Sequence, residues 1–132
     1  MTNIELFNEY TARILGRLYA SFPEKITLDP RQISGHDQVD DFGRLEKPAE
    51  HCLATLQWLA EAGLIRTDGC DRHYCRACVL TPKGLHLLNA VPDSLQGKTP
   101  LGARLAALIG EGAIDLAKEA VKTAITGLAA GS

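Results

Sequence analysis

The hydrophobic positions at the start of the chain change from a helical to an alternating period. Residues 4–22 carry apolar side chains at every third or fourth position, which is the spacing of an amphipathic helix. Asn3 can cap this helix, and Pro23 ends it. Residues 25–29 then alternate between polar and apolar, which predicts a short strand. An Asp-Pro pair follows and predicts a short helix over residues 30–34.

The segment 34–47 has a weaker pattern. Val39, Phe42 and Leu45 recur at every third residue, which favours a second short helix that faces the core. Gly43 lowers the helical propensity of this segment. We nevertheless predict that it forms the helix before the next, longer one.

A helix, a hairpin and a second helix are predicted in direct succession after Pro48. Residues 48–62 repeat apolar side chains with helical spacing, and Gly63 ends that helix. Two runs rich in strand-forming residues, 64–67 and 74–80, flank a polar turn. Thr81-Pro82 then starts the second helix. This order is the ending of a winged helix-turn-helix, with residues 25–29 as the third strand of its sheet.

The hairpin also carries a family resemblance. The GLI run at 63–65, Asp71-Arg72 in the turn, and the LTPKG run at 80–84 resemble the wing of MarR-type regulators. In that family the helix before the wing enters the major groove of DNA, and the wing tip approaches the minor groove. The resemblance therefore implies a DNA-binding domain over residues 1–92.

A long apolar stripe follows the winged region. Residues 93–100 are rich in turn formers and predict a linker. Residues 101–130 carry apolar side chains largely on one helical face, and Gly110 and Gly112 favour a break into two helices. Such a stripe needs a partner, either the first helix of the same chain or the same segment of a second chain. We favour a homodimer through this C-terminal segment, because winged-helix regulators often pair through terminal helices.

The composition fits one folded domain. Of the 132 residues, 45% are hydrophobic and 23% are charged, so the chain can bury a core. The formal net charge of −2 gives no bulk signal for binding nucleic acid. No apolar stretch is long enough to span a membrane, and the N-terminus lacks the pattern of a signal peptide. We expect a cytoplasmic, mostly helical α+β protein.

The charges near the predicted wing give evidence both for and against DNA binding. The candidate DNA contacts are Lys47, His51 and Thr55 on the helix and Arg66, Arg72 and Arg76 on the wing. Residues 64–84 carry four basic against two acidic side chains, a surplus suited to phosphate contacts. Residues 36–63, however, carry six acidic against two basic side chains, which repel DNA. A DNA-binding regulator is the first hypothesis, and a winged-helix module that binds protein without DNA is the alternative.

The cysteines offer a second kind of chemistry. Cys70, His73, Cys75 and Cys78 lie within nine residues and are the ligand types of a tetrahedral zinc site. A regular strand over 74–80 would point Cys75 and Cys78 to opposite faces, which prevents them from sharing one ion. We therefore expect reduced structural thiols, with zinc binding and redox sensing by Cys75 and Cys78 as alternatives. Cys52 lies on the apolar stripe of its helix and is expected in the core.

Enzyme chemistry has little support in the sequence. There is no glycine-rich phosphate loop and no arrangement of a nucleophile with a base. His36 lies near two aspartates, but a solvated polar loop explains this grouping better. We predict neither a cofactor nor a catalytic residue.

Overall fold

The computed structural model describes residues 2–90 and 99–130, with only the backbone for residues 128–130. The elements are α1 (Asn3–Ser21), β1 (Ile26–Leu28), α2 (Pro30–Ser34), α3 (Lys47–Glu61), β2 (Ile65–Arg66), β3 (Gly69–Cys70), β4 (Cys75–Leu80), α4 (Pro82–Asn89), α5 (Leu101–Gly110) and α6 (Ile114–Ala130). The expected mostly helical α+β class with a small antiparallel sheet is confirmed. The predicted linker 93–100 lies outside the described residues except for its last two. Within the described residues, no helix combines the length and apolar character needed to cross a membrane.

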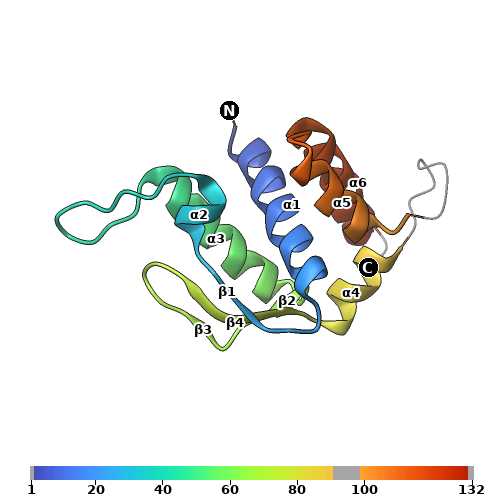
Figure 1. The fold of residues 1–132 in the computed structure, drawn as a ribbon, viewed down its shortest axis with the longest axis horizontal. Coiled ribbons are helices and arrows are strands. Elements are labelled where there is room, and N and C mark those ends of the chain that lie inside the picture. Colours follow the sequence, from blue (N-terminus) through green and yellow to red (C-terminus); the bar gives the residue numbers. More distant parts are fainter. Residues whose placement is uncertain (1, 91–98, 131–132) are drawn as a thin grey trace.

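Helix α1 is the central element of the fold. It lies between α3 on one side and α5 and α6 on the other (Figure 1). Its cap is Thr2 rather than the expected Asn3, which is already the first helical residue. The Thr2 hydroxyl accepts a hydrogen bond from the Glu5 amide, and the Glu5 carboxylate accepts one from the Thr2 amide, both at 3.1 Å. This reciprocal pair is a capping box, which satisfies two amides at the start of the helix.

The sheet confirms the predicted ribbon and its third strand. Strand β4 lies at the centre, with β1 on one side and β2 and β3 in succession on the other, all antiparallel. The first strand of the ribbon is interrupted at residues 67–68, which divides it into β2 and β3. The pairing of β1 with β4 is irregular, because Ala77 has a positive φ of 51° and adds one residue to β4.

The predicted helix within residues 34–47 does not form. Residues 36–46 instead make a loop closed by an isolated bridge between Val39 and Leu45. The Asp40 carboxylate accepts hydrogen bonds from the amides of Phe42 and Arg44, at 2.8 and 2.9 Å, which is a turn that competes with a helix. Gly43 has a φ of +77°, which a right-handed helix does not allow. Phe42 does not face the core and is 72% exposed.

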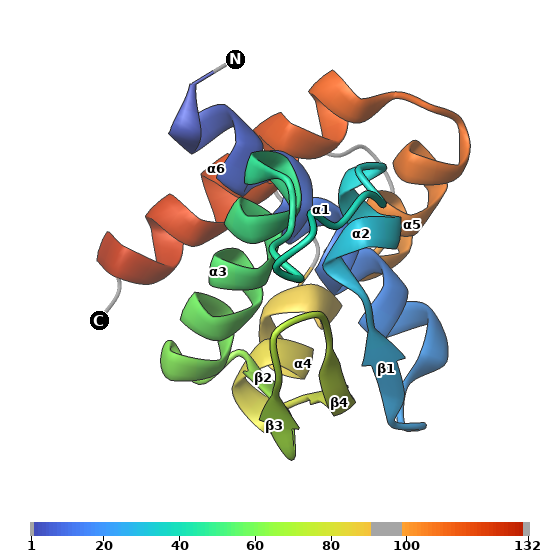
Figure 2. The ribbon, with the colours of Figure 1, turned by 90° about the vertical axis from the view of Figure 1, so that its left-hand side faces the viewer.

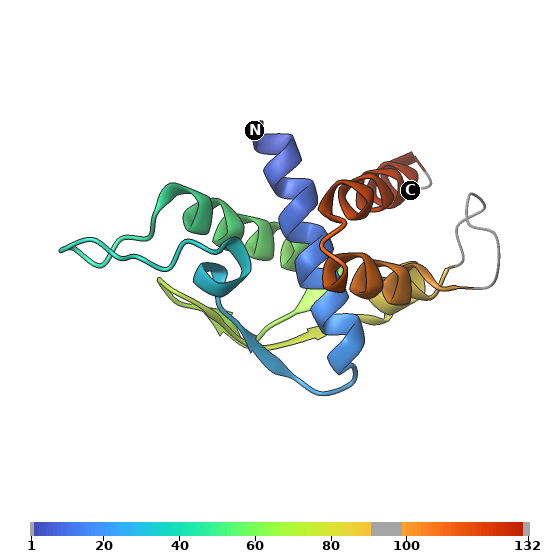
Figure 3. The same cartoon turned by 45° about the horizontal axis from the view of Figure 1, so that its top comes forward.

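Most of the C-terminal stripe is buried within the same chain, although Leu116 on α6 is 58% exposed. The expected break occurs at Gly112, whose φ is +76°, and α5 and α6 both pack on α1 (Figure 3). The buried side chains of these two helices are Leu101, Leu105, Leu108, Ala117 and Val121. They join the hydrophobic cluster formed by α1, α3 and the sheet. The structure therefore shows the alternative of an intramolecular cover for these buried side chains.

Candidate functional site

The loop 36–46, the start of α3 and the tip of the ribbon lie at one end of the molecule (Figures 1 and 2). Lys47 is the first residue of α3, and Pro48 follows it in the first turn, where its missing amide costs nothing. The Lys47 side chain is 95% exposed, as predicted. Its ammonium nitrogen lies 3.7 Å from the Glu50 carboxylate. The one cation that α3 presents at this end is thus beside an acid of the same helix.

Thr55 and His51 do not lie on the exposed face of α3. Thr55 is 3% exposed, and its hydroxyl donates a 2.9 Å hydrogen bond to the His51 carbonyl oxygen. His51 is half-buried, and its ring centroid lies 6.0 Å from that of Tyr10. The expectation that Thr55 lies on the face opposite the core is therefore wrong. Thr55 is three residues after Cys52 and four before Leu59, so it belongs to the buried stripe.

The face of α3 that is exposed to solvent has little net charge. It consists of Lys47, Glu50, Ala54, Gln57, Trp58 and Glu61. Trp58 is 44% exposed and also packs edge-on against Phe7, with ring centroids 5.2 Å apart. Ala54 and Gln57 were not among the predicted site residues, although their spacing from Lys47 and Glu50 places them on the same face.

The three arginines of the ribbon have different surroundings. Arg66 and Arg76 are exposed on the ribbon. Arg72, at the tip, donates a 2.7 Å hydrogen bond from Nη2 to the Phe42 carbonyl oxygen. Next to it, Nε2 of His73 donates a 2.8 Å hydrogen bond to the Gly43 carbonyl oxygen. The tip therefore binds the loop 36–46.

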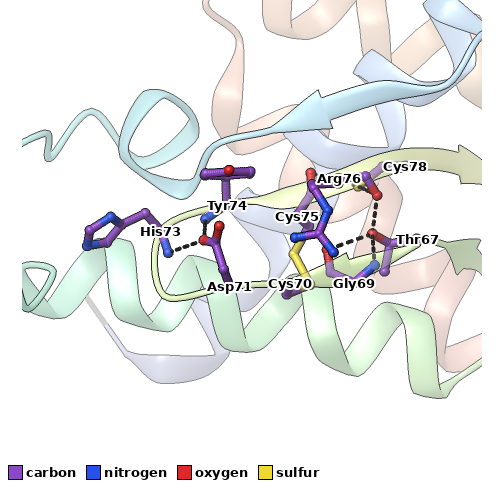
Figure 4. The surroundings of a disulfide bond; sticks show 9 residues. All are labelled: Thr67, Gly69, Cys70, Asp71, His73, Tyr74, Cys75, Arg76 and Cys78. Atoms are coloured by element: carbon purple, nitrogen blue, oxygen red, sulfur yellow. Dashed lines mark hydrogen bonds between the residues drawn. A yellow bond between two sulfur atoms is a disulfide. The ribbon is translucent and has the colours of Figure 1, made fainter.

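The ribbon tip is itself held in one conformation by Asp71 (Figure 4). Its carboxylate accepts hydrogen bonds from the amides of His73 and Tyr74, at 2.8 and 3.0 Å. These bonds, that from His73 first, lower the pKa of Asp71 below its usual value, because they stabilise the ionised carboxylate. The Asp71 amide in turn donates to the Tyr74 carbonyl oxygen at 2.9 Å.

The cysteines are not all reduced, contrary to expectation. Cys70 and Cys75 form a disulfide across the ribbon, next to its tip (Figure 4). Cys52 is a free, buried thiol, as predicted, and Cys78 is also free and buried. Sequence spacing alone does not determine which cysteines pair.

The four candidate zinc ligands are not gathered around one point. Two of the sulfur atoms are bonded to each other, and the His73 ring is turned to Gly43. Among the residues that the structure describes, no group of three potential ligands surrounds a common position. Cys75 and Cys78 were expected on opposite faces of their strand. That expectation was also wrong, since both are buried on the inner face of β4. The extra residue at Ala77 brings Cys78 back to the face of Cys75.

The loop 36–46 is acidic. It carries four acidic side chains and one basic one. The basic residue, Arg44, lies over the exposed Phe42 ring, with its guanidinium carbon 5.2 Å from the ring centroid. Acidic groups therefore border the start of α3 and make this end of the molecule repel anions.

No protein-family model matches this chain, and the searches of curated proteins and of solved structures gave no match either.

Proposed function

We propose that this chain is a DNA-binding transcriptional regulator of the winged helix-turn-helix type, with α3 as the groove-binding helix and the β2–β4 ribbon as the wing. The observation that supports this most directly is the succession of α3, an antiparallel ribbon and α4, with β1 completing the sheet. The MarR-like residues at 63–65, 71–72 and 80–84 lie in this same part of the chain. A winged helix of this order presents its third helix and its ribbon to DNA on one side.

Lys47, Arg66 and Arg76 are the contacts proposed for DNA. All three are exposed, and among the described contacts the only partner of these cations is the Glu50 carboxylate, 3.7 Å from the Lys47 ammonium nitrogen. Lys47 lies in the first turn of α3, the part of a groove-binding helix that reaches base edges or phosphates. Thr55 is excluded from the set by its burial, and Arg72 holds the loop 36–46.

A double variant, Arg66→Ala with Arg76→Ala, tests the proposal. Binding of a mixed set of duplex fragments at low salt should weaken, and the negative slope of log affinity against log salt should become shallower by about 2. Arg17→Ala with Arg104→Ala is the control, because it removes the same charge from α1 and α5. Equal binding by both double variants would contradict a role for the ribbon.

The acidic surface favours a second candidate, a winged-helix module that binds protein and not DNA. Glu50 and Glu61 outnumber Lys47 among the charges on the exposed face of α3, and the loop beside it is acidic. Non-specific DNA binding is a property of DNA-binding domains at low salt. If the unmodified chain binds no duplex DNA fragment at low salt in a gel-shift assay, the protein-binding candidate replaces the DNA-binding one.

A further inference from the structure

Two hydrogen bonds join segments that are thirty residues apart in sequence. Arg72 and His73, at the tip of the ribbon, bind the carbonyl oxygens of Phe42 and Gly43. The other hydrogen bonds described for loop 36–46 stay within it or reach the adjoining helices α2 and α3. The tip is thus the only distant segment to which the described part of this loop is hydrogen-bonded. We call these two bonds the tip clamp.

The disulfide lies at the base of the ribbon tip that carries the tip clamp. Cys70 and Cys75 are the residues on either side of the four-residue tip 71–74 (Figure 4). The bonds of Asp71 fix the shape of the tip itself, but strand β3 has only two residues, so few backbone hydrogen bonds attach the tip to the rest of the ribbon without the disulfide. A cross-link restricts the conformations open to the residues between its ends. Arg72 and His73 lie between those ends, so the disulfide limits where their side chains can reach.

We propose that the Cys70–Cys75 disulfide is a redox-sensitive switch that sets whether the tip clamp holds the loop 36–46. When the disulfide is formed, Arg72 and His73 are held against the loop. When it is reduced, the tip gains freedom, the two hydrogen bonds break for much of the time, and the loop moves away from the ribbon.

The chemical step is thiol–disulfide exchange with a dithiol reductant. A thiolate of the dithiol attacks the sulfur of Cys70, which is half-buried, whereas Cys75 is 1% exposed. The Cys75 sulfur leaves as a thiolate and takes up a proton, and a mixed disulfide joins Cys70 to the reductant. The second thiolate of the reductant then attacks the reductant sulfur that is bonded to Cys70. Cys70 leaves as a thiolate and takes up a proton. The protein disulfide is reduced to two thiols while the dithiol is oxidised to a disulfide.

The loop leads directly into the start of α3, so the switch acts on the candidate site. Glu46 is the N-cap residue of α3, and its carbonyl oxygen accepts from the Glu50 amide. Release of the loop changes the position of its acidic side chains relative to Lys47. The switch itself does not depend on DNA being the ligand, because its direct effect is on the loop.

Hydrogen exchange of the backbone amides tests the switch. The chain is prepared with the disulfide formed and again after treatment with dithiothreitol. Upon reduction, amides of residues 71–74 and 40–44 should exchange at least about tenfold faster. Amides of α1 and α5 should keep their rates, because those helices lie away from the tip (Figure 1). Faster exchange at 71–74 without any change at 40–44 would overturn the clamp, and faster exchange throughout would make the disulfide a general support of the fold.

Three variants distinguish the effect of the disulfide on exchange from the effect of the tip clamp itself. Cys70→Ser with Cys75→Ser should show the fast rates with or without reductant. Cys78→Ala, which removes the neighbouring thiol, should keep the full response. Arg72→Ala should accelerate exchange at 40–44 while the disulfide stays intact. Alkylation in denaturant after mild oxidation should label two cysteines of the unmodified chain, and labelling of all four would show that the disulfide does not form.

Discussion

The Asp29 side chain stabilises the start of α2 in two ways. Its Oδ1 atom accepts a 2.9 Å hydrogen bond from the Arg31 amide, which caps the helix. Its carboxylate also pairs with the Arg31 guanidinium at 2.8 Å. Burial alone would raise the pKa of Asp29, but the hydrogen bonds and the charge of Arg31 outweigh it and lower the pKa below 3.8. The ionised form therefore stabilises the folded state above the unfolded pKa.

Substitutions at Asp29 separate the cap from the charge. Asp29→Ala should lower the free energy of unfolding at neutral pH by about 1 kcal/mol, because the cap is lost. Asp29→Asn keeps a capping oxygen, so its loss should be smaller and come mainly from the ion pair. Because the folded pKa is lowered, the wild-type advantage over Asp29→Asn should vanish as pH falls through that pKa. Urea unfolding between neutral pH and about pH 2 measures this, and an advantage that persists in acid would contradict the pKa shift.

Cys52 should be unreactive in the folded protein. It is fully buried between α3 and α1, and burial raises the pKa of its thiol to about 12. Only the thiolate reacts with alkylating reagents, so modification at about pH 8 should wait for unfolding. Mass spectrometry after a timed exposure to iodoacetamide measures this. Modification of Cys52 at the rate of a free thiol in a small peptide would show that α3 separates from α1 in the native state.

Not every side-chain position followed from the sequence. Thr55 was predictable, since it shares the spacing of the buried stripe of its helix. The disulfide was not, because connectivity depends on the distance between two cysteines in the fold. The bulge at Ala77 was not predictable either, and it determines which way Cys78 points.

Helix α4 lies so close to Leu64, in the connection between α3 and β2, that one glycine permits the contact. A Cβ added at Gly84 would lie 2.0 Å from the Leu64 carbonyl oxygen, which accepts a hydrogen bond from the Thr81 amide. Backbone on both sides leaves no flexible atom to move aside. Close packing therefore explains why position 84, in the LTPKG run, is a glycine, and this explanation requires no ligand.

Gly84→Ala should lower the free energy of unfolding by about 3 kcal/mol, because the added methyl group forces the two segments apart. Gly127→Ala is the matched control in α6, where nothing lies near the added Cβ. That substitution should instead raise the free energy of unfolding by up to about 1 kcal/mol through helix propensity. Denaturant unfolding of both variants measures the difference, and equal effects would show that α4 is not packed against Leu64 as described.

The elements with a clear period were predictable, and the one without it was not. The stripes of α1 and α3 and the alternation of β1 correspond to observed elements, because burial on one face selects the matching period. In the segment 34–47 three apolar residues suggested a helix. Local hydrogen bonds of Asp40 and the positive φ of Gly43 make a loop there instead. Three apolar residues spaced three apart are too short a pattern to outweigh local turn-forming hydrogen bonds.

The molecule as a whole is organised around α1, which buries apolar side chains on opposite sides. Tyr10 lies against α3, while Gly16 allows α5 to come close, with the Ile109 side chain 3.3 Å from the position of an added Cβ. A periodic pattern shows that a stripe will be buried but not which surface will cover it. That is why the sequence left two partners open for the C-terminal segment, and why only the fold distinguishes them.

Leu105→Ala tests whether α1 is the permanent cover of that segment. Leu105 is fully buried, so the loss of its side chain should lower the free energy of unfolding by about 2–5 kcal/mol. Because its contacts are within one chain, the loss should be the same in dilute and concentrated protein. Leu116→Ala is the matched control on α6, where a side chain that is 58% exposed should contribute less than about 0.5 kcal/mol. Unfolding curves at several protein concentrations measure both variants. A loss for Leu105→Ala that changes with concentration would show that the stripe also helps to hold two subunits together.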